Sequence, residues 1–421
     1  MQILKVLTRS IFLPLVLVIV TSVCYALFSY SLTAPNLTLT NWSPYSSFQT
    51  EMWRTFFNNR LLLTQVYITI ITILTLCYTF LVFQSYRLRA SLSTWTLSSK
   101  MAFIVALSIP FVVASSALSY DIFNYIFNAK MVLVYHANPH QMVALDFSGD
   151  LWTRFMHNTH TPAPYGYGWT AFSLLPSVLG FGKLLLTWFN FKVFSWISYL
   201  LLAGVYVLQL KKEWWKALLV LANPLVLIEI IGNSHNDLWM LAPAMISLIL
   251  ISKLKKIKVQ KLIIPLMLLL VSVSVKLATI VLIPLFIVIL MHKSNLSFLK
   301  LFKPITLCIN NHWPLVASVA LFVPLFLERS KWFLPWYSVW ALVWLPLFLP
   351  TKNNYMAKFT RVWQSLLIGF SISSLYRYIP FLWAGNYDGS VISEQILITW
   401  VGGVAVGSFI FFLTGKFKHA S

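Results

Sequence analysis

The chain has 421 residues, of which 59% are hydrophobic and only 10% are charged. A soluble domain carries roughly 25% charged residues, so this composition excludes a soluble globular protein and predicts a polytopic membrane protein. A net charge of +21 could indicate a nucleic-acid partner. The basic residues instead lie in short clusters between apolar runs, where such residues set topology and contact anionic lipid. We therefore expect membrane lipid, and no nucleic acid, as a partner.

Apolar runs long enough to cross a bilayer recur along the whole chain. The predicted transmembrane helices, about twelve in number, cover residues 11–32, 62–84, 101–119, 187–210, 216–232, 238–252, 262–275, 277–291, 308–327, 333–350, 362–379 and 395–414. Residues 262–291 hold two helices if the chain turns near Lys276, and one continuous helix is the alternative. We expect an all-α fold in which residues 1–421 form a single integral membrane domain.

The loops between these helices sort by charge. Most lysines and arginines fall on the side that also holds both termini, so the positive-inside rule places the termini in the cytoplasm. Nearly all acidic residues fall on the opposite side. A further span within 167–186 would invert the downstream loops, so we expect that stretch to lie along the outer leaflet. Residues 120–186 then form a large extracytoplasmic loop with juxtamembrane segments, where a membrane protein can place a site.

Asp121 directly follows the third predicted helix and is flanked by aromatic and apolar residues. A partly desolvated carboxylate at this position can have a raised pKa and act as a general base. The alternative is an ordinary helix-end cap or a solvated interfacial side chain.

Two segments of the outer loop, 135–140 and 161–169, combine aromatic rings with amide and hydroxyl groups. Such combinations are typical of sugar-binding surfaces, where rings stack on pyranose faces. The alternative is an interfacial belt of aromatic residues. Residues 232–237 form a polar stretch between two apolar helices, and a plain outer turn is the alternative there. A metal site would need ligands beyond His235 and Asp237, so we predict no metal site.

Two cations stand out downstream. Lys276 is the only charged residue within 268–290, and ionisable residues at such depth are costly and tend to be functional. It could bind a phosphate or couple an ion in a transporter, or it could extend to the outer headgroups from a helix turn. Arg377 lies between two tyrosines near an outer helix end. It could bind a phosphate with two hydrogen bonds or anchor to a lipid headgroup.

Taken in order, these segments resemble the GT-C fold glycosyltransferases, most closely the bacterial polyprenol-phosphate-mannose-dependent mannosyltransferases. The family's outer-loop Asp, Asn-Pro-Tyr, Thr-Pro-Tyr-Gly-Pro-like and Gly-His-Asn-Asp elements correspond to Asp121, Asn138-Pro139-His140, Ala163-Pro164-Tyr165-Gly166-Tyr167 and Ser234-His235-Asn236-Asp237. A Lys…Pro helix is matched by Lys276 with Pro284, and a late Pro-Trp-Tyr motif by Pro335-Trp336-Tyr337. His140 and Tyr167 depart from the usual Tyr and Pro. The resemblance covers about 100–350.

The resemblance implies a function. A hexose, mannose in the family, would pass from a polyprenyl-phosphate donor to an extracytoplasmic glycan or glycolipid acceptor, with inversion and with Asp121 as general base. Lys276, Arg377 and His235 would bind the donor phosphate. The implied substrate-binding residues are Tyr125, Asn138, Tyr165, Asn236, Asp237, Trp336 and Tyr337. No cofactor is implied, and the sequence offers no support for a divalent cation. The implied location is the bacterial cell membrane.

Two other classes of protein remain open at the level of sequence. A secondary transporter or lipid translocase would suit about twelve helices and a buried Lys276, but transporters usually carry internal repeats with matching broken helices. We find no such repeat in this sequence. A non-catalytic membrane scaffold is the third reading.

Overall fold

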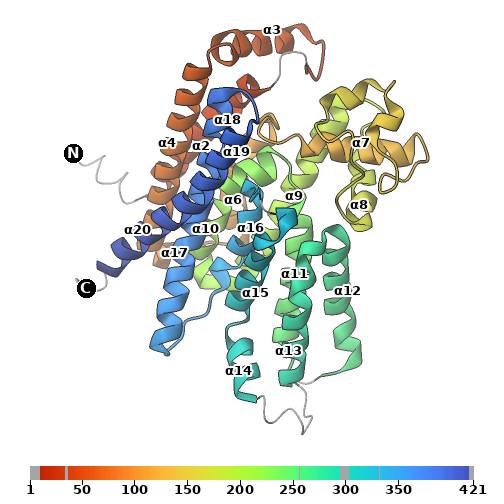
Figure 1. Cartoon of the computed structure of the whole chain (residues 1–421). Helices are drawn as coiled ribbons and strands as arrows, with labels where there is room; N and C mark the ends of the chain where they lie inside the picture. The colour runs from red at the N-terminus through yellow and green to blue at the C-terminus, as the bar shows by residue number, and fades with distance from the viewer. Residues whose placement is uncertain (1–9, 34–36, 256, 294–302, 331, 417–421) are drawn as a thin grey trace, which may run out of the picture.

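The computed structural model describes residues 10–33, 37–255, 257–293, 303–330 and 332–416, and every regular element within these ranges is helical. The predicted all-α class is confirmed. Figure 1 shows a bundle of long helices with a smaller helical lobe, which contains α7 and α8, projecting from one end. This arrangement matters for function because the lobe and the bundle meet at the site described below.

The N-terminal half of the bundle is built from four long helices and several short ones. They are α2 (Phe12–Phe28), η1 (Ser29–Leu32), α3 (Ser43–Met52), η2 (Trp53–Phe57), α4 (Arg60–Arg87), α5 (Arg89–Leu92), α6 (Leu97–Val112) and α9 (Leu184–Leu210). α2 packs against α4 and α6, and α6 packs against α9. Asn59 caps α4 by accepting a hydrogen bond of 3.0 Å from the Leu62 amide, which explains why the helix begins at residue 60.

The middle of the chain forms broken and paired helices. They are η5 (Lys211–Ala217), α10 (Leu218–Leu221), η6 (Val226–Gly232), α11 (Asp237–Ser252), α12 (Val259–Val275), η7 (Leu277–Leu282) and α13 (Ile283–Lys293). The predicted helix 216–232 is interrupted at residues 222–223, because Pro224 lacks an amide hydrogen and Oδ1 of Asn223 accepts a hydrogen bond of 3.0 Å from the Leu225 amide. Lys276 has extended backbone angles between α12 and η7. Residues 262–291 are therefore divided at Lys276 into α12 and the continuous stretch of η7 and α13, and the single-helix alternative is wrong.

The C-terminal third packs across this middle part. Its elements are α14 (Lys303–Asn311), α15 (Trp313–Phe322), η9 (Val323–Phe326), η10 (Glu328–Ser330), η11 (Pro335–Tyr337), α16 (Ser338–Leu342), η12 (Leu345–Leu347), α17 (Asn354–Tyr376), α18 (Ile379–Ala384), α19 (Gly389–Leu397), η13 (Ile398–Gly402) and α20 (Gly403–Lys416). α17 and α20 pack closely because glycines meet. A Cβ on Gly369 would lie 2.4 Å from the Gly403 oxygen, and small residues allow such close backbone approach in membrane helices.

The lobe corresponds to the predicted loop 120–186. It contains α7 (Asp121–Leu133), η3 (Ala144–Phe147), η4 (Leu151–Phe155) and α8 (Tyr167–Val178). α8 has 12 residues, which at 1.5 Å per residue is too short to cross a hydrocarbon core of about 30 Å. A salt bridge of 2.5 Å between Lys130 and Asp150 joins α7 to the segment before η4.

The predicted number of about twelve membrane spans is not confirmed. Within the described ranges, five helical stretches are long and apolar enough to cross a membrane, or up to seven if two bent helix pairs each count as one span. The bends are 112° between η6 and α11, and 85° between α14 and the helix that follows it. α6, α12 and the stretch Leu277–Lys293 are apolar but shorter, and 333–350 folds into short buried pieces rather than one helix.

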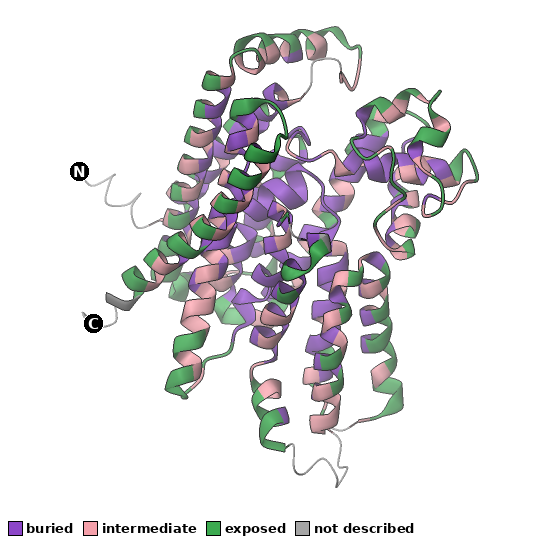
Figure 2. Ribbon diagram, viewed as in Figure 1, coloured by how far each residue is buried: buried purple, intermediate pink, exposed green. Residues whose placement is uncertain are grey.

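Figure 2 shows buried residues concentrated where the helices of the bundle meet, with exposed residues on the outward faces. Many outward side chains are large and apolar. Leu76 on α4, Ile264 on α12 and Phe412 on α20 are each more than 60% exposed. A protein surrounded by water would not expose so many apolar groups, whereas lipid tails accommodate them. The chain is therefore a membrane protein.

Candidate active site

A cavity of about 810 Å³ lies where the lobe meets the bundle. Segments far apart in sequence supply its lining, from η1 to α19. The polar and aromatic side chains on its wall include Arg60, Ser119, Tyr120, Asp121, Asn124, His157, Asn158, Tyr165, Lys276, Trp336, Tyr337, Trp340, Arg377, Tyr378, Tyr387 and Gln395. The apolar part is contributed chiefly by η7, η9 and the residues before η11. A volume of this size lies within the range of about 300–1,000 Å³ that is common for small-molecule sites.

Asp121 is the first residue of α7, and its side chain is 17% exposed. Its Oδ2 accepts a hydrogen bond of 2.9 Å from the Tyr165 hydroxyl and lies 3.5 Å from Nδ1 of His235. Among the described residues, no hydrogen bond or ion pair involves Oδ1. The carboxylate is therefore fixed through one oxygen, while the other can accept a proton.

The ionisation of Asp121 differs from the sequence-based expectation. Burial by itself opposes ionisation, but the hydrogen bonds and the charge of His235, the Tyr165 hydroxyl and the charge of Lys276 outweigh it. The pKa of Asp121 is consequently lowered from its ordinary value of 3.8, not raised as expected. The sequence could not reveal this because each of these partners comes from another segment of the chain.

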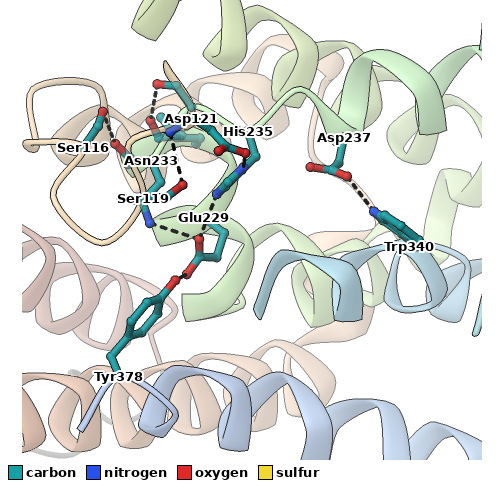
Figure 3. Close-up of polar contacts among 12 residues, drawn as sticks. Ser116, Ser119, Asp121, Glu229, Asn233, His235, Asp237, Trp340 and Tyr378 are labelled. Atoms are coloured by element: carbon teal, nitrogen blue, oxygen red, sulfur yellow. Dashed lines mark hydrogen bonds and ion pairs between the residues drawn. The ribbon is translucent and has the colours of Figure 1, made fainter. Parts of the chain in front are cut away.

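His235 lies behind the wall of the cavity. Its ring is fully buried and stacks on Trp336, with ring centroids 3.7 Å apart. Its Nε2 lies 3.3 Å from Oε2 of Glu229, a carboxylate that is also fully buried. Figure 3 shows Glu229 between His235 and Tyr378. His235 was expected to bind the donor phosphate; its ring does not line the cavity, and Trp336 stacks on one of its faces.

Lys276 and Asp237 form a charge pair at another wall. Oδ1 of the buried Asp237 accepts hydrogen bonds from Lys276 Nζ at 2.8 Å and from Trp340 Nε1 at 2.5 Å. The Trp340 contact is also visible in Figure 3. The ammonium group lies 5.0 Å from the Trp340 ring centroid and 5.4 Å from that of Tyr337. Asp237 thus neutralises most of the charge that Lys276 brings to the cavity.

Arg60 and Arg377 also line the cavity, and within the described ranges neither forms an ion pair. The Arg377 side chain is buried, and its Nη1 donates to Thr399 Oγ1 at 3.4 Å. The Arg60 guanidinium lies 4.4 Å from the Phe57 ring centroid and packs against Gly385, where φ is +77°. Two guanidinium groups that lack carboxylate partners are suited to binding an anion.

The loop that carries Tyr165 is docked on the break after α12. The amide of Gly166 donates to the carbonyl of Val275 at 3.0 Å. A Cβ at Gly166 would lie 1.9 Å from the Ser274 oxygen, and one at Gly168 would lie 2.1 Å from the Ser274 hydroxyl. Only glycine therefore allows this approach.

The structure brings six of the predicted residues to the cavity wall, namely Asp121, Tyr165, Lys276, Trp336, Tyr337 and Arg377. Asp237 lies behind Lys276. Three further residues that were expected to contact substrate, Tyr125, Asn138 and Asn236, do not line the cavity. Tyr125 and Asn236 are buried. Asn138 lies on the lobe, where its Nδ2 donates to the Tyr167 hydroxyl at 3.4 Å.

Three residues of the site, Arg60, Glu229 and Trp340, were not predicted from the sequence. Glu229 interrupts an otherwise apolar stretch from Val226 to Gly232, and an ionisable residue in such a stretch is itself a functional signal. Arg60 begins a long apolar helix and offers no comparable signal. Within the described part of the chain, no group of three His, Cys, Asp or Glu residues is arranged to hold a metal ion.

Comparison with known proteins supplies the family. A family model described as alpha-(1->6)-mannopyranosyltransferase, N-terminal domain, matches residues 19–292, well over half of the chain. Neither the curated proteins nor the solved structures yield a match. The matched region contains Asp121, Glu229, His235, Asp237 and Lys276, whereas Trp336 and Arg377 lie beyond it. The chain therefore belongs to this family of mannosyltransferases and is a GT-C-like glycosyltransferase of the membrane.

Proposed function

We propose that this enzyme moves a mannose from a polyprenyl-phosphate donor to a hydroxyl group of an extracytoplasmic glycan or glycolipid, with inversion at the anomeric carbon. One observation carries the proposal. A single cavity has the carboxylate of Asp121 on one wall and the guanidinium groups of Arg60 and Arg377 on others. A base and an anion site that share one space are what glycosyl transfer from a phosphate requires.

The wall of the cavity suits a lipid-linked donor better than a nucleotide sugar. Leu277, Ile280, Pro324, Leu327 and Leu334 line its apolar part. Leu277 and Leu327 are each close to 60% exposed, so this part of the wall continues onto the lipid-facing surface. A polyprenyl chain can leave the cavity there while its phosphate stays at the arginines.

The reaction follows from these positions. The oxygen of an acceptor hydroxyl attacks the anomeric carbon on the face opposite the phosphate, and its proton passes to Oδ1 of Asp121. The bond between the anomeric carbon and the phosphate oxygen breaks, and the electron pair stays with the phosphate. The leaving group gains negative charge, which Arg60 and Arg377 stabilise. Lys276 remains paired with Asp237 and can donate to the sugar or the phosphate, while Trp336 and Tyr337 offer rings to the pyranose.

We also propose the orientation of the enzyme in the cell membrane. The site and residues 120–186 lie on the extracytoplasmic side, both termini lie in the cytoplasm, and the shorter apolar helices α6 and α12 cross the membrane with the longer ones. Support comes from the lysines and arginines, most of which would fall on the cytoplasmic side. In this arrangement residues 120–186 form the catalytic lobe of a single membrane domain.

The test is transfer by purified protein in lipid vesicles. Polyprenyl-phosphate mannose, polyprenyl-phosphate glucose and a nucleotide-linked mannose are supplied separately with a mannose oligosaccharide as acceptor. We expect transfer from the lipid-linked mannose and none from the nucleotide sugar. The Asp121→Asn variant should lose at least about 100-fold in rate. Asp146→Asn, the same change at an exposed position of the lobe, should keep the wild-type rate.

The results with the three donors and with the Asp121→Asn variant test the donor, the base and the sugar separately. Transfer from the nucleotide sugar alone would overturn the donor assignment. An Asp121→Asn variant as fast as the wild type would show that Asp121 is not the base. Preferential use of the glucose donor would correct the sugar and leave the chemistry in place.

A further inference from the structure

Glu229 is a fully buried carboxylate that does not line the cavity. Its Oε1 accepts a hydrogen bond of 2.8 Å from the Tyr378 hydroxyl, and its Oε2 accepts one of 3.0 Å from Asn233 Nδ2. His235 is the cationic partner that the described residues provide, at 3.3 Å from Oε2. Burying a carboxylate is expensive without such partners. The free-energy cost of burying the Glu229 carboxylate indicates that it has a role beside the catalytic centre.

His235 joins this buried carboxylate to the base. Its Nε2 faces Glu229 and its Nδ1 faces Oδ2 of Asp121, at 3.3 and 3.5 Å. Carboxylate oxygens only accept hydrogen bonds, so an imidazole between two carboxylates is satisfied when both ring nitrogens carry protons. With both protons in place the ring is a cation flanked by two carboxylates. The stack on Trp336, with 24° between the ring planes, sets its orientation.

The backbone around His235 is also fixed. Lys192, a buried residue of α9, donates through Nζ to the carbonyls of Ile231 at 2.8 Å and of Gly232. The hydroxyl of Ser116 donates to the same Gly232 carbonyl at 3.1 Å. Ser234 has a φ of +61°, a left-handed conformation that costs energy for a residue other than glycine. The turn that carries His235 is thus held in one conformation by groups from two other elements.

From this geometry we propose that Glu229 is a positioning residue for the transferase reaction. Acting through His235, it holds Oδ2 of Asp121 so that Oδ1 is presented to the acceptor hydroxyl, and it keeps a positive charge beside the base. The inference rests on the proposed function, because it assigns Glu229 a role in the same reaction. Glu229 itself contacts neither donor nor acceptor.

The main test is the Glu229→Gln variant, which keeps the shape and an oxygen that can accept from Tyr378 but removes the charge. We expect kcat to fall roughly 10- to 100-fold, the loss typical of an outer partner of a functional histidine. The KM for the donor should stay near the wild-type value because the donor does not touch this residue. Glu213→Gln is the matched control, because Glu213 is an exposed acid with 62% of its side chain accessible. It should behave as the wild type.

Two further variants distinguish positioning from simple support of the fold. Glu229→Asp keeps the charge and should retain clearly more activity than Glu229→Gln. If Glu229 acts only through His235, the double variant Glu229→Gln/His235→Asn should be no slower than His235→Asn alone. If Glu229→Gln lowers the rate by the same factor with and without His235→Asn, Glu229 does not act through His235. Each rate is normalised to monodisperse protein, and thermal unfolding is recorded for every variant.

The protonation of His235 can be measured without catalytic turnover. In protein labelled with ¹⁵N-histidine, the ring nitrogens of His235 should both be protonated at pH 7, and Glu229→Gln should change this signal. A neutral His235 ring in the wild type would overturn the inference. A Glu229→Gln variant with the wild-type kcat and a lower unfolding midpoint would also overturn it. Failure of the proposed function has a different result: in the transfer assay, the wild-type enzyme would transfer nothing from the lipid-linked donor.

Discussion

The hydroxyl group of Tyr165 donates a hydrogen bond of 2.9 Å to Oδ2 of Asp121, and it does so from a loop 44 positions further along the chain. The Tyr165 ring also packs edge-on against Tyr125, with centroids 5.0 Å apart. The hydrogen bond therefore comes from a side chain whose position is fixed independently of the carboxylate. This geometry allows the contribution of the hydroxyl to be tested without disturbing the packing.

Replacing Tyr165 by Phe should lower kcat about tenfold, since a hydrogen bond to a charged group contributes about 1.5–3 kcal/mol and the ring stays in place. Initial rates with the lipid-linked donor measure the effect. Tyr135→Phe is the control, because the Tyr135 hydroxyl donates to another carboxylate of the lobe, Asp150, at 2.8 Å. Equal rates for the wild type and Tyr165→Phe would mean that this hydrogen bond does not hold the base.

The pH dependence of transfer should report the lowered pKa of Asp121. A carboxylate acts as a base only when it is ionised, so a pKa below 3.8 predicts a rate that stays flat from pH 7 to about 5 and declines only at lower pH. The titratable groups that face Asp121 are His235, Tyr165, Lys276 and, at the cavity wall, His157. His235→Asn removes a cation that favours the ionised form, so its acid limb should shift to higher pH. An unchanged acid limb would contradict the assigned base.

Breaking the pair between Lys276 and Asp237 should destabilise the protein, because Asp237 is fully buried. Lys276→Met leaves this carboxylate without its cation and should cost about 3 kcal/mol. The double variant Lys276→Met/Asp237→Asn removes both charges and should recover most of that loss. Thermal unfolding in detergent measures both variants. A double variant less stable than Lys276→Met would argue that the pair does not act as a unit.

Arg377→Gln should raise the KM for the lipid-linked donor about 10- to 100-fold, because a guanidinium without a carboxylate partner is replaced by a neutral amide. Arg60→Gln should act in the same direction. Arg54→Gln is the control, since Arg54 is exposed on η2 and does not line the cavity. Steady-state kinetics with varied donor distinguish the variants. An Arg377→Gln variant with the wild-type KM and the wild-type kcat would place Arg377 away from the bound phosphate.

Orientation in the membrane is tested with single cysteines in a variant in which Cys24, Cys77 and Cys308 are replaced by Ala. Leu151 in the lobe and Tyr355 at the start of α17 are 74% and 88% exposed, respectively. A maleimide that cannot cross membranes should label Leu151→Cys in intact cells and Tyr355→Cys only after lysis. The reverse pattern would invert the proposed topology.

Composition and apolar length were enough to predict the membrane class and several helices. The predicted span 238–252 corresponds to α11, and the turn expected near Lys276 is present. Apolar length gave a wrong prediction for residues 333–350. Their apolar run indicated a span, but it folds into the buried pieces η11, α16 and η12, and apolar length alone does not distinguish a span from a buried core segment.

The candidate site was predictable only in part for a related reason. Asp121, Lys276 and Arg377 are unusual in their local sequence, so they could be singled out. The contacts among buried site residues could not be predicted, because Trp340 meets Asp237 across 103 positions and Tyr378 meets Glu229 across 149. Pairing at such separations is decided by how the helices pack, and a single sequence does not record it.

The hydrogen bond from Gly166 to the carbonyl of Val275 has a mechanical consequence. The residue after Val275 is Lys276, and the residue before Gly166 is Tyr165, so one contact joins the wall that holds the base to the wall that holds an ammonium group. The backbone that carries Tyr165 and the backbone that carries Lys276 are therefore directly connected, and a shift of one segment is passed to the other.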